Sequence, residues 1–191
     1  MIHMLRQIKQ KTKDHSAFTI AETLVAILIL LMVSSVVAAG IPAARNAYEN
    51  VEMTANAELL LSSTISTLRN ELSLAKDVKI KDITVTEGES DNDYSDAIEY
   101  VSPYTGSGSQ IYKHSDGVIM FNRYANTDMS IASGKPERLI APELSTKVGL
   151  EITYKSVSKK NGYILFEDLE VTNGIRILTS RSKVSIRIVS Y

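Results

Sequence analysis

The sequence predicts an α+β fold in which one long N-terminal helix packs against a C-terminal antiparallel β-sheet. Leu24 to Ile41 is an almost wholly apolar run, interrupted only by Ser34 and Ser35. After it, apolar residues recur every three or four positions as far as Ala75, which is the spacing of an amphipathic helix. Beyond Asp77, short runs of alternating apolar and polar residues are typical of strands. The helix should therefore have an apolar first half and a second half that covers one face of the sheet.

The bulk composition is that of an ordinary folded protein. The 191 residues are 44% hydrophobic and 23% charged, which argues against a disordered chain and against a polytopic membrane protein. The formal net charge of −1 disfavours nucleic-acid binding by the head as a whole, because that activity normally needs a basic surface. The chain has no cysteine, which excludes disulfides, thiolate metal sites and a cysteine nucleophile.

The N-terminal region has the pattern of a segment that inserts into a membrane. The 18 residues from Leu24 to Ile41 would form about 27 Å of helix at about 1.5 Å per residue, close to the roughly 30 Å hydrocarbon layer of a bilayer. The first 16 residues contain one acid, Asp14, and four basic residues, which are Arg6, Lys9, Lys11 and Lys13. The positive-inside rule therefore predicts a cytoplasmic N-terminus and a C-terminal part on the other side of the membrane.

Other fates of the apolar run remain open at this point. A secretory signal peptide would be cut after Ala39, since Val37-Ala38-Ala39 supplies small residues before Gly40. An uncut membrane anchor and a buried helix of a soluble protein are further alternatives. Glu22 argues against the signal peptide, because a carboxylate at the head of an apolar segment is costly to bury and gains nothing there.

The residues around Glu22 carry a more specific pattern. Ala17-Phe18-Thr19-Ile20-Ala21-Glu22 follows a short basic leader and precedes the apolar helix, and it resembles the prepilin cleavage and methylation signature of type IV pilins and pseudopilins. The resemblance implies that prepilin peptidase cuts the bond between Ala17 and Phe18 on the cytoplasmic side. It also implies N-methylation of the new Phe18 amine, which keeps the positive charge.

In the mature chain, the resemblance implies a salt bridge between the Glu22 carboxylate and the Phe18 ammonium of a neighbouring subunit. In an apolar helix bundle the two charges would neutralise each other. A buried ion pair adds little net stability, but a missing partner leaves a lone charge that is strongly unfavourable. We therefore expect the pair to set the register of assembly, while the apolar helix face supplies the affinity.

The implied protein is a type IV pilin-like subunit, with a minor pilin or a pseudopilin favoured, in a pilus, a secretion pseudopilus or a competence filament. Its expected partners are prepilin peptidase, other pilin or pseudopilin subunits, the pilus assembly platform, and the membrane through a single helix. We expect it in the cytoplasmic (inner) membrane before assembly, with an extracellular or periplasmic head, and in a cell-surface filament afterwards. The expected parts are a leader at 1–17, an apolar helix at 18–42, an amphipathic helix at 43–76 and a β-rich head at 77–191.

The second half of the helix should bury one face, and Pro42 should mark a bend or a locally melted turn because proline lacks the backbone N–H. The residues expected on the buried face are Ala44, Tyr48, Val51, Ala55, Leu59, Leu61, Ile65, Leu68, Leu72 and Ala75. The expected strands are 78–80, 83–85, 98–101, 110–113, 118–122, 148–154, 163–171 and 183–189. Turn sequences at 115–117 and 160–162 should join neighbouring strands into hairpins, and 102–109 and 130–142 should be surface loops.

The head shows no convincing catalytic or metal pattern, so we expect neither an enzyme nor a cofactor. His114 is followed by Ser115 and Asp116, but adjacent residues point in different directions, and a hairpin end explains them better than a triad. S-x-x-K strings at 156–159 and 180–183 are common by chance. The acidic segment 87–96 lacks the glycine and the final glutamate of an EF-hand loop, so we interpret it as a solvated loop, with calcium binding as a minor alternative.

The main rival to a filament subunit is an extracellular binding or sensing module that is membrane-anchored or secreted and does not assemble. Its ligand face would be built from tyrosines in and near the loops of the head. These are Tyr94, Tyr100, Tyr104, Tyr112 and Tyr124.

Overall fold

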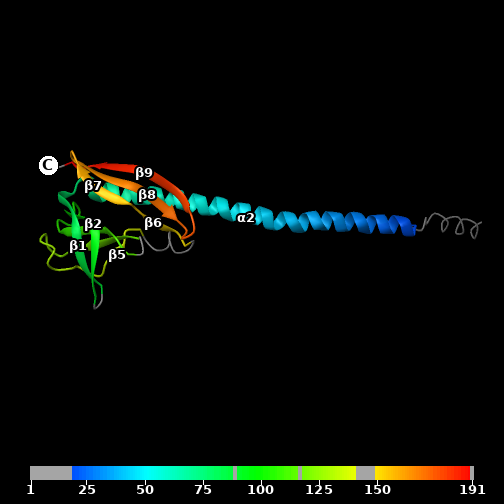
Figure 1. Cartoon of the computed structure of the whole chain (residues 1–191), viewed down its shortest axis with the longest axis horizontal. Helices are drawn as coiled ribbons and strands as arrows, with labels where there is room; N and C mark the ends of the chain where they lie inside the picture. Colours follow the sequence, from blue (N-terminus) through cyan, green and yellow to red (C-terminus); the bar gives the residue numbers. More distant parts are fainter. Residues whose placement is uncertain (1–18, 88–89, 116–117, 141–148, 190–191) are drawn as a thin grey trace, which may run out of the picture. The chain divides into compact units, whose positions relative to one another are not determined.

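The computed structural model describes residues 19–87, 90–115, 118–140 and 149–189. Helix α2 (Ile20–Ser73) is followed by a succession of strands, most of which are labelled in Figure 1. By their internal contacts, the described residues divide into two units, one up to residue 49 and one from residue 50 onward. The fold class predicted from the sequence is confirmed, because one long helix is followed by antiparallel sheets that pack on its C-terminal part.

Helix α2 continues through Pro42 without interruption, so the expectation of a melted turn there is wrong. Proline removes a single N–H from the ladder, and the hydrogen bonds on either side are sufficient to keep the helix intact. The helix ends at Ser73, slightly before the predicted end, and the first strand begins at Lys76.

The first sheet is a five-stranded antiparallel meander in which neighbours in sequence are neighbours in space. Its strands are β1 (Lys76–Glu87), β2 (Ser90–Val101), β3 (Gly108–Lys113), β4 (Ile119–Arg123) and β5 (Glu137–Arg138). The two separate runs expected at 78–80 and 83–85 belong to β1, which has a register shift between Lys81 and Ile83. Strand β1 lies at the edge of this sheet.

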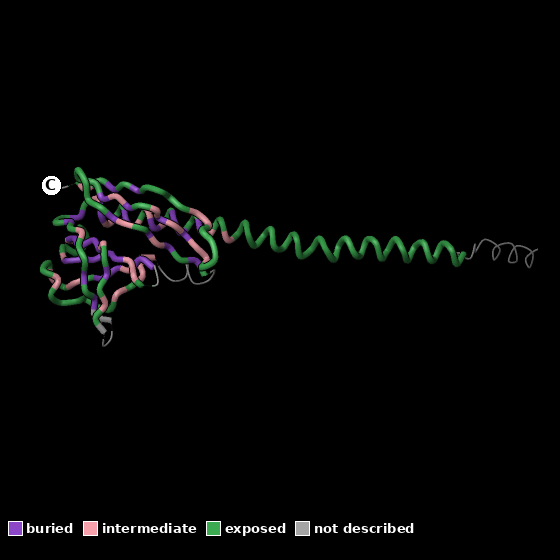
Figure 2. Tube along the Cα trace, in the orientation of Figure 1, coloured by how far each residue is buried: buried purple, intermediate pink, exposed green. Residues whose placement is uncertain are grey.

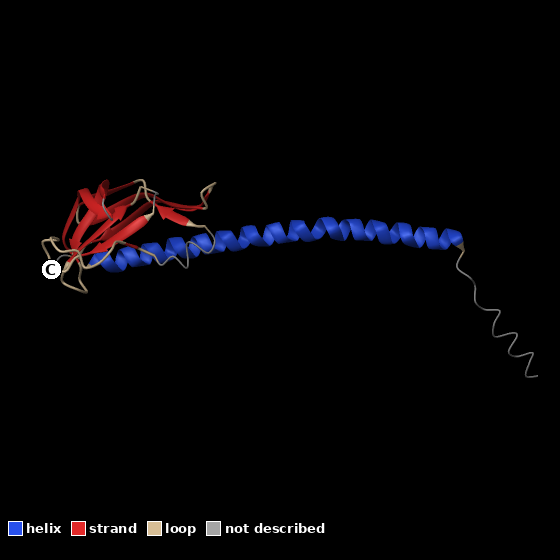
Figure 3. Cartoon of the chain, turned by 90° about the horizontal axis from the view of Figure 1, so that it is seen from below, coloured by secondary structure: helices blue, strands red, loops and turns tan. Residues whose placement is uncertain are grey.

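The second sheet is arranged around β8 (Tyr163–Thr172). Strands β6 (Glu151–Thr153) and β7 (Ser156–Lys160) pair with successive parts of β8, and β9 (Ile177–Arg187) pairs along its whole length. Every pairing in both sheets is antiparallel, as predicted. In Figure 3 the strands gather beside the C-terminal part of α2.

The predicted hairpin at Lys160-Asn161-Gly162 is confirmed. Strand β7 ends at Lys160, β8 begins at Tyr163, and the two residues between them have φ values of 52° and 76°. Positive φ at both central residues matches the strand twist of a tight hairpin, and asparagine and glycine tolerate it best. Strands β3 and β4 also pair as a hairpin, although residues 116–117 of the predicted turn lie outside the described residues.

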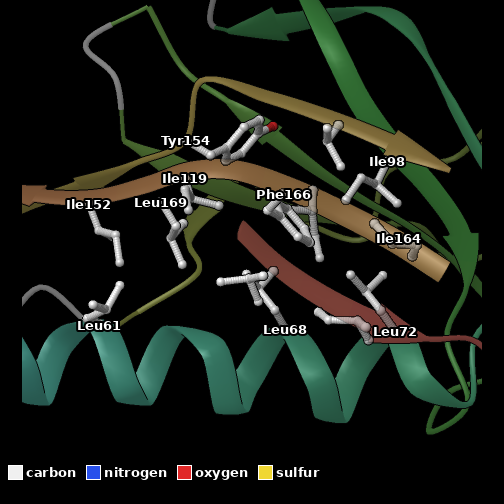
Figure 4. Close-up of a cluster of buried hydrophobic side chains, with 14 of the residues drawn as sticks. Leu61, Leu68, Leu72, Ile98, Ile119, Ile152, Tyr154, Ile164, Phe166 and Leu169 are labelled. Atoms are coloured by element: carbon white, nitrogen blue, oxygen red, sulfur yellow. The ribbon is translucent and has the colours of Figure 1, made fainter. Parts of the chain in front are cut away.

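The main core lies between α2 and the inner faces of both sheets. Leu61, Leu68 and Leu72 point from the helix towards Ile164, Phe166 and Leu169 of β8 (Figure 4). Phe166 and Leu169 are both buried although they are three residues apart, because Asp168 adopts φ 48° and shifts the alternation of β8 by one residue. A smaller cluster on the first sheet contains Tyr94, Tyr112 and their apolar neighbours.

The prediction for the buried helix face is only partly right. Leu61, Leu68, Leu72 and Ala75 are buried as expected. The earlier positions are exposed: Ala44, Tyr48, Val51, Ala55 and Leu59. Figure 2 shows that the helix is exposed from its start and that buried positions appear only in its last part, where the first buried residue is Ala57. The stripe from 44 to 59 is therefore not covered by the described residues of this chain.

The acidic segment 87–96 is not a loop, which corrects the interpretation given above. Glu87 ends β1 and residues 90–96 belong to β2, with residues 88–89 outside the described part of the chain. Asp93 accepts a hydrogen bond from Thr84 Oγ1 at 2.7 Å across the two strands. The segment was misread because acids on an exposed strand resemble a solvated loop in composition. Strand β7, the two-residue β5 and the first part of β9 were also missed.

Candidate assembly site at the start of the helix

Helix α2 begins with a reciprocal cap built by Thr19 and Glu22. The backbone N–H of Glu22 donates to Thr19 Oγ1 at 3.2 Å, and Glu22 Oε2 accepts from the backbone N–H of Thr19 at 2.9 Å. The Thr19 hydroxyl also donates to Oε2 at 3.0 Å. This arrangement is a capping box, in which a threonine and a glutamate three residues later satisfy N–H groups that the helix itself leaves unpaired. The sequence Thr-Ile-Ala-Glu dictates it locally.

The cap fixes the orientation of the Glu22 carboxylate and leaves part of its bonding capacity open. Both hydrogen bonds from Thr19 end on Oε2, and Oε1 accepts none from any residue in the described ranges. A carboxylate has about four lone-pair sites, so a donor from outside the chain can still bind. Ala17 and Phe18, the predicted cleavage residues, lie outside the described residues, and the predicted Phe18–Glu22 pairing therefore stays a prediction.

The helix surface that follows Glu22 is almost wholly apolar, and none of the described residues covers it. Its most apolar 18-residue window has a mean hydropathy of 2.8 and is 0% buried. Leu24, Met32 and Ile41 are each more than 60% exposed. It is the one helix in the described part of the chain that is long and apolar enough to cross a membrane. An apolar surface of this extent requires a bilayer or other apolar helices around it.

Most of the other residues singled out in the sequence take part in the packing of the head. The His114 ring lies 5.6 Å from that of Tyr94, and its backbone N–H donates to Val118 O at the end of the β3–β4 hairpin. The ammonium group of Lys159, in one S-x-x-K string, donates to Val78 O, while Ser156 donates to Glu167. Within the described residues, no three histidine, aspartate or glutamate side chains form a group that could hold a metal ion.

The tyrosines do not form the predicted recognition surface. Tyr94, Tyr100 and Tyr112 belong to strands and are buried, with 6%, 0% and 0% of their surface exposed. Burial and the neighbouring Glu71 carboxylate raise the pKa of Tyr100, whose hydroxyl donates to Glu71 Oε2 at 3.2 Å. Tyr104 is exposed, and Tyr124 is half-buried in a polar network.

Sequence reasoning missed this network, which joins Glu99, Gln110, Asn122 and Tyr124 on the outer face of the first sheet. We call these four residues the polar ladder. Glu99, Gln110 and Asn122 each follow or precede an apolar residue in their strands, which is also the pattern of an ordinary exposed face. Burial distinguishes the two cases, and burial depends on strand pairing that the sequence does not specify.

No protein-family model matches the chain, and neither a curated protein nor a solved structure matches it.

Proposed function

We propose that the chain is a type IV pilin-like subunit, with a minor pilin or a pseudopilin favoured, which is trimmed between Ala17 and Phe18 and assembled through its apolar helix. The observation that carries the proposal is the capping box at Thr19 and Glu22, directly after the predicted cut. It holds a carboxylate at the head of an exposed apolar helix with Oε1 open to a donor from another chain.

The charge and the apolar surface have separate roles in this proposal. Apolar contacts between helices attract neighbouring subunits without fixing how far one slides along the next. A carboxylate that must meet an ammonium does fix this position, because a lone charge in an apolar bundle is unfavourable by several kcal/mol. The Phe18 amine would supply that ammonium only after the leader is removed, so cleavage would license assembly.

The proposed partners follow from this assembly. The helix has the length and hydropathy to cross a membrane once. The orientation with a cytoplasmic N-terminus rests on the basic residues of the leader. Prepilin peptidase, other pilin or pseudopilin subunits and the assembly platform are the proposed partners. The filament at the cell surface, or the pseudopilus beneath it, is the proposed final location.

N-terminal sequencing and intact mass measurement of the protein from its native host test the proposal directly. A mature chain that begins at Phe18, with an added methyl group on the amine, is the expected result. A chain that begins at Gly40 would instead identify a secreted protein, and an intact N-terminus would identify a plain anchor. Either of these two results would overturn the proposal.

A further inference from the structure

The outer face of the first sheet has a groove that the filament proposal does not use. Its volume is about 790 Å³, within the range of small-ligand sites. One side is formed by the edge strand β1 from Lys76 to Thr84, and the other by residues 124 and 127–129. Its floor includes Glu99 and Gln110 of the polar ladder. All of these residues belong to the unit from residue 50 onward.

The polar ladder crosses three strands in register. Glu99 lies opposite Gln110, and Gln110 lies opposite Asn122. Gln110 Nε2 donates to Glu99 Oε1 at 2.7 Å, and Tyr124 OH donates to Gln110 Oε1 at 2.7 Å. Asn122 Nδ2 donates to Tyr124 OH at 3.1 Å. The three hydrogen bonds therefore form one chain that ends at Glu99 Oε1. The other oxygen of this carboxylate, Oε2, forms an ion pair with Lys81 Nζ at 2.9 Å.

Stability alone does not account for this ladder. Glu99, Gln110 and Asn122 are only 8%, 4% and 5% exposed, and burying such groups costs more than burying apolar side chains of the same size. The network is also incomplete, because Asn122 Oδ1 is buried and accepts no hydrogen bond from a described residue. Asn122 does not line the groove, but Glu99, Gln110 and Tyr124 do, and a buried polar network that lines a groove is typical of a binding site.

The wall opposite β1 is held in place before any ligand arrives. The backbone N–H of Gly108 donates to Asn126 O, and that of Tyr124 donates to Gly108 O, both at 2.9 Å. Asn126 also binds Ser130 through its side chain. The Met129 side chain lies over Gly108 so closely that a Cβ there would come within 2.5 Å of Met129 Cγ. A preformed wall lowers the entropy that a ligand would lose on binding.

The groups along the groove are mixed in charge, and this restricts the ligand. Three lysines and four carboxylates contribute to the lining, which favours neither a phosphate nor a metal cation. Lys76 and Lys79 make no ion pair with any described residue, so their ammonium groups can donate to a ligand. Carboxylates accept from hydroxyl groups, and the ammonium and amide groups donate to them. A ligand rich in hydroxyls satisfies both kinds of group at once.

We propose that this groove binds a neutral saccharide, with Glu99 and Lys79 contacting its hydroxyl groups. The saccharide is either free in solution or part of a surface glycan, since both present the same hydroxyl chemistry. Recognition uses side chains of the sheet face. The inference does not rest on cleavage or on filament assembly, so it stands or falls separately from the proposed function.

The test uses the full-length chain in a zwitterionic detergent, because a detergent with a sugar headgroup would compete for the groove. A panel of neutral oligosaccharides at millimolar concentration is screened by ligand-observed NMR, alongside sulfated oligosaccharides and short extended peptides. Binding by Lys79→Met and Glu99→Gln is then compared with binding by Lys160→Met. Lys160 is an exposed strand lysine in the other sheet, so its variant is the matched control for a lost positive charge.

We expect at least one neutral oligosaccharide to bind and its affinity to fall about tenfold or more in each groove variant, as for loss of a charged hydrogen-bond partner. Lys160→Met should bind like the wild type. A surface glycan as the source would show up as tighter binding of an immobilised array than of the free sugar. The proposal is overturned if no neutral oligosaccharide binds, if sulfated sugars or peptides bind better, or if Lys79→Met and Glu99→Gln both retain wild-type affinity.

Discussion

Replacing Glu22 with glutamine and, separately, with alanine distinguishes the two roles that its carboxylate can have. Glutamine can still complete a capping box with Thr19, because its side-chain oxygen accepts from the Thr19 N–H. It carries no charge, so it cannot neutralise an ammonium on a neighbouring subunit. Alanine removes both functions. Thr19→Val is the converse variant, since it removes the capping hydroxyl but keeps the carboxylate.

The expected magnitudes separate the two roles. Loss of a cap costs about 1 kcal/mol, or roughly a fivefold change in an equilibrium. Loss of one member of a buried ion pair costs about 3–5 kcal/mol, which is at least about a hundredfold. Glu22→Gln should therefore reduce incorporation into filaments about a hundredfold and Glu22→Ala a few-fold further. Thr19→Val should reduce it only a few-fold.

The assay measures the amount of each variant in sheared filaments relative to the amount in the membrane. Glu52→Gln is the control for charge, because Glu52 is an exposed acid further along the same helix. Unfolding of each full-length variant in detergent should match the wild type, since no contact of Glu22 with the head core is among the described interactions. Near-normal incorporation of Glu22→Gln together with poor incorporation of Glu22→Ala would refute charge pairing and leave capping as the role of Glu22.

Three further predictions concern processing and the head. Ala17→Trp should block removal of the leader, seen as a mass that retains residues 1–17; normal processing would contradict the cleavage assignment. Leu68→Ala should lower the free energy of unfolding by about 2–5 kcal/mol in denaturant titrations, because Leu68 is fully buried, whereas the exposed Leu59→Ala should change it by less than about 0.5 kcal/mol. Burial raises the pKa of Tyr100 and Tyr154. Their contribution to the free energy of unfolding is therefore complete below the pKa of an unfolded tyrosine, which is about 10. Above that pH, the free energy of unfolding should fall by about 1.4 kcal/mol per pH unit for each tyrosine. Tyr154→Phe should reduce this alkaline slope while Tyr104→Phe should not, and equal slopes for both would contradict the assignment.

The helix could be predicted because its apolar pattern depends on neighbours in sequence, and the capping box at its start, which was not among the predictions, has an equally local cause. Thr19 and Glu22 are three residues apart, and a helix brings such residues together whatever the rest of the chain does. The apolar run from Leu24 likewise has only one regular structure available in a membrane. The sequence did not predict how much of the helix is buried. Helix α2 carries apolar residues on two sides, and the packing of the sheets determines which side is covered.

The formation of the polar ladder and of strand β2 depends on pairing between segments that are distant in sequence. Asp93 is acidic and Tyr94 aromatic, and composition alone favoured a loop with exposed tyrosines. In the structure Asp93 binds Thr84 on one face of the hairpin, while Tyr94 stacks on Tyr112 at 4.7 Å on the other. Register sets which side chains meet across strands, and a shift of one residue would exchange the two faces. The sequence contains too little information about register to locate the groove.

The way β9 is attached to the helix determines how the head responds to a pulling force. Arg176 binds Asn50, Thr179 binds Glu58, and the backbone N–H of Val189 donates to Ser73 O at 2.7 Å. These contacts advance together along both elements, so β9 runs lengthwise beside the last part of α2. A tensile load on the helix therefore reaches the second sheet in shear and is shared by the many hydrogen bonds between β8 and β9. Strands loaded in this direction must break those bonds together, whereas strands pulled apart from one end break them in turn.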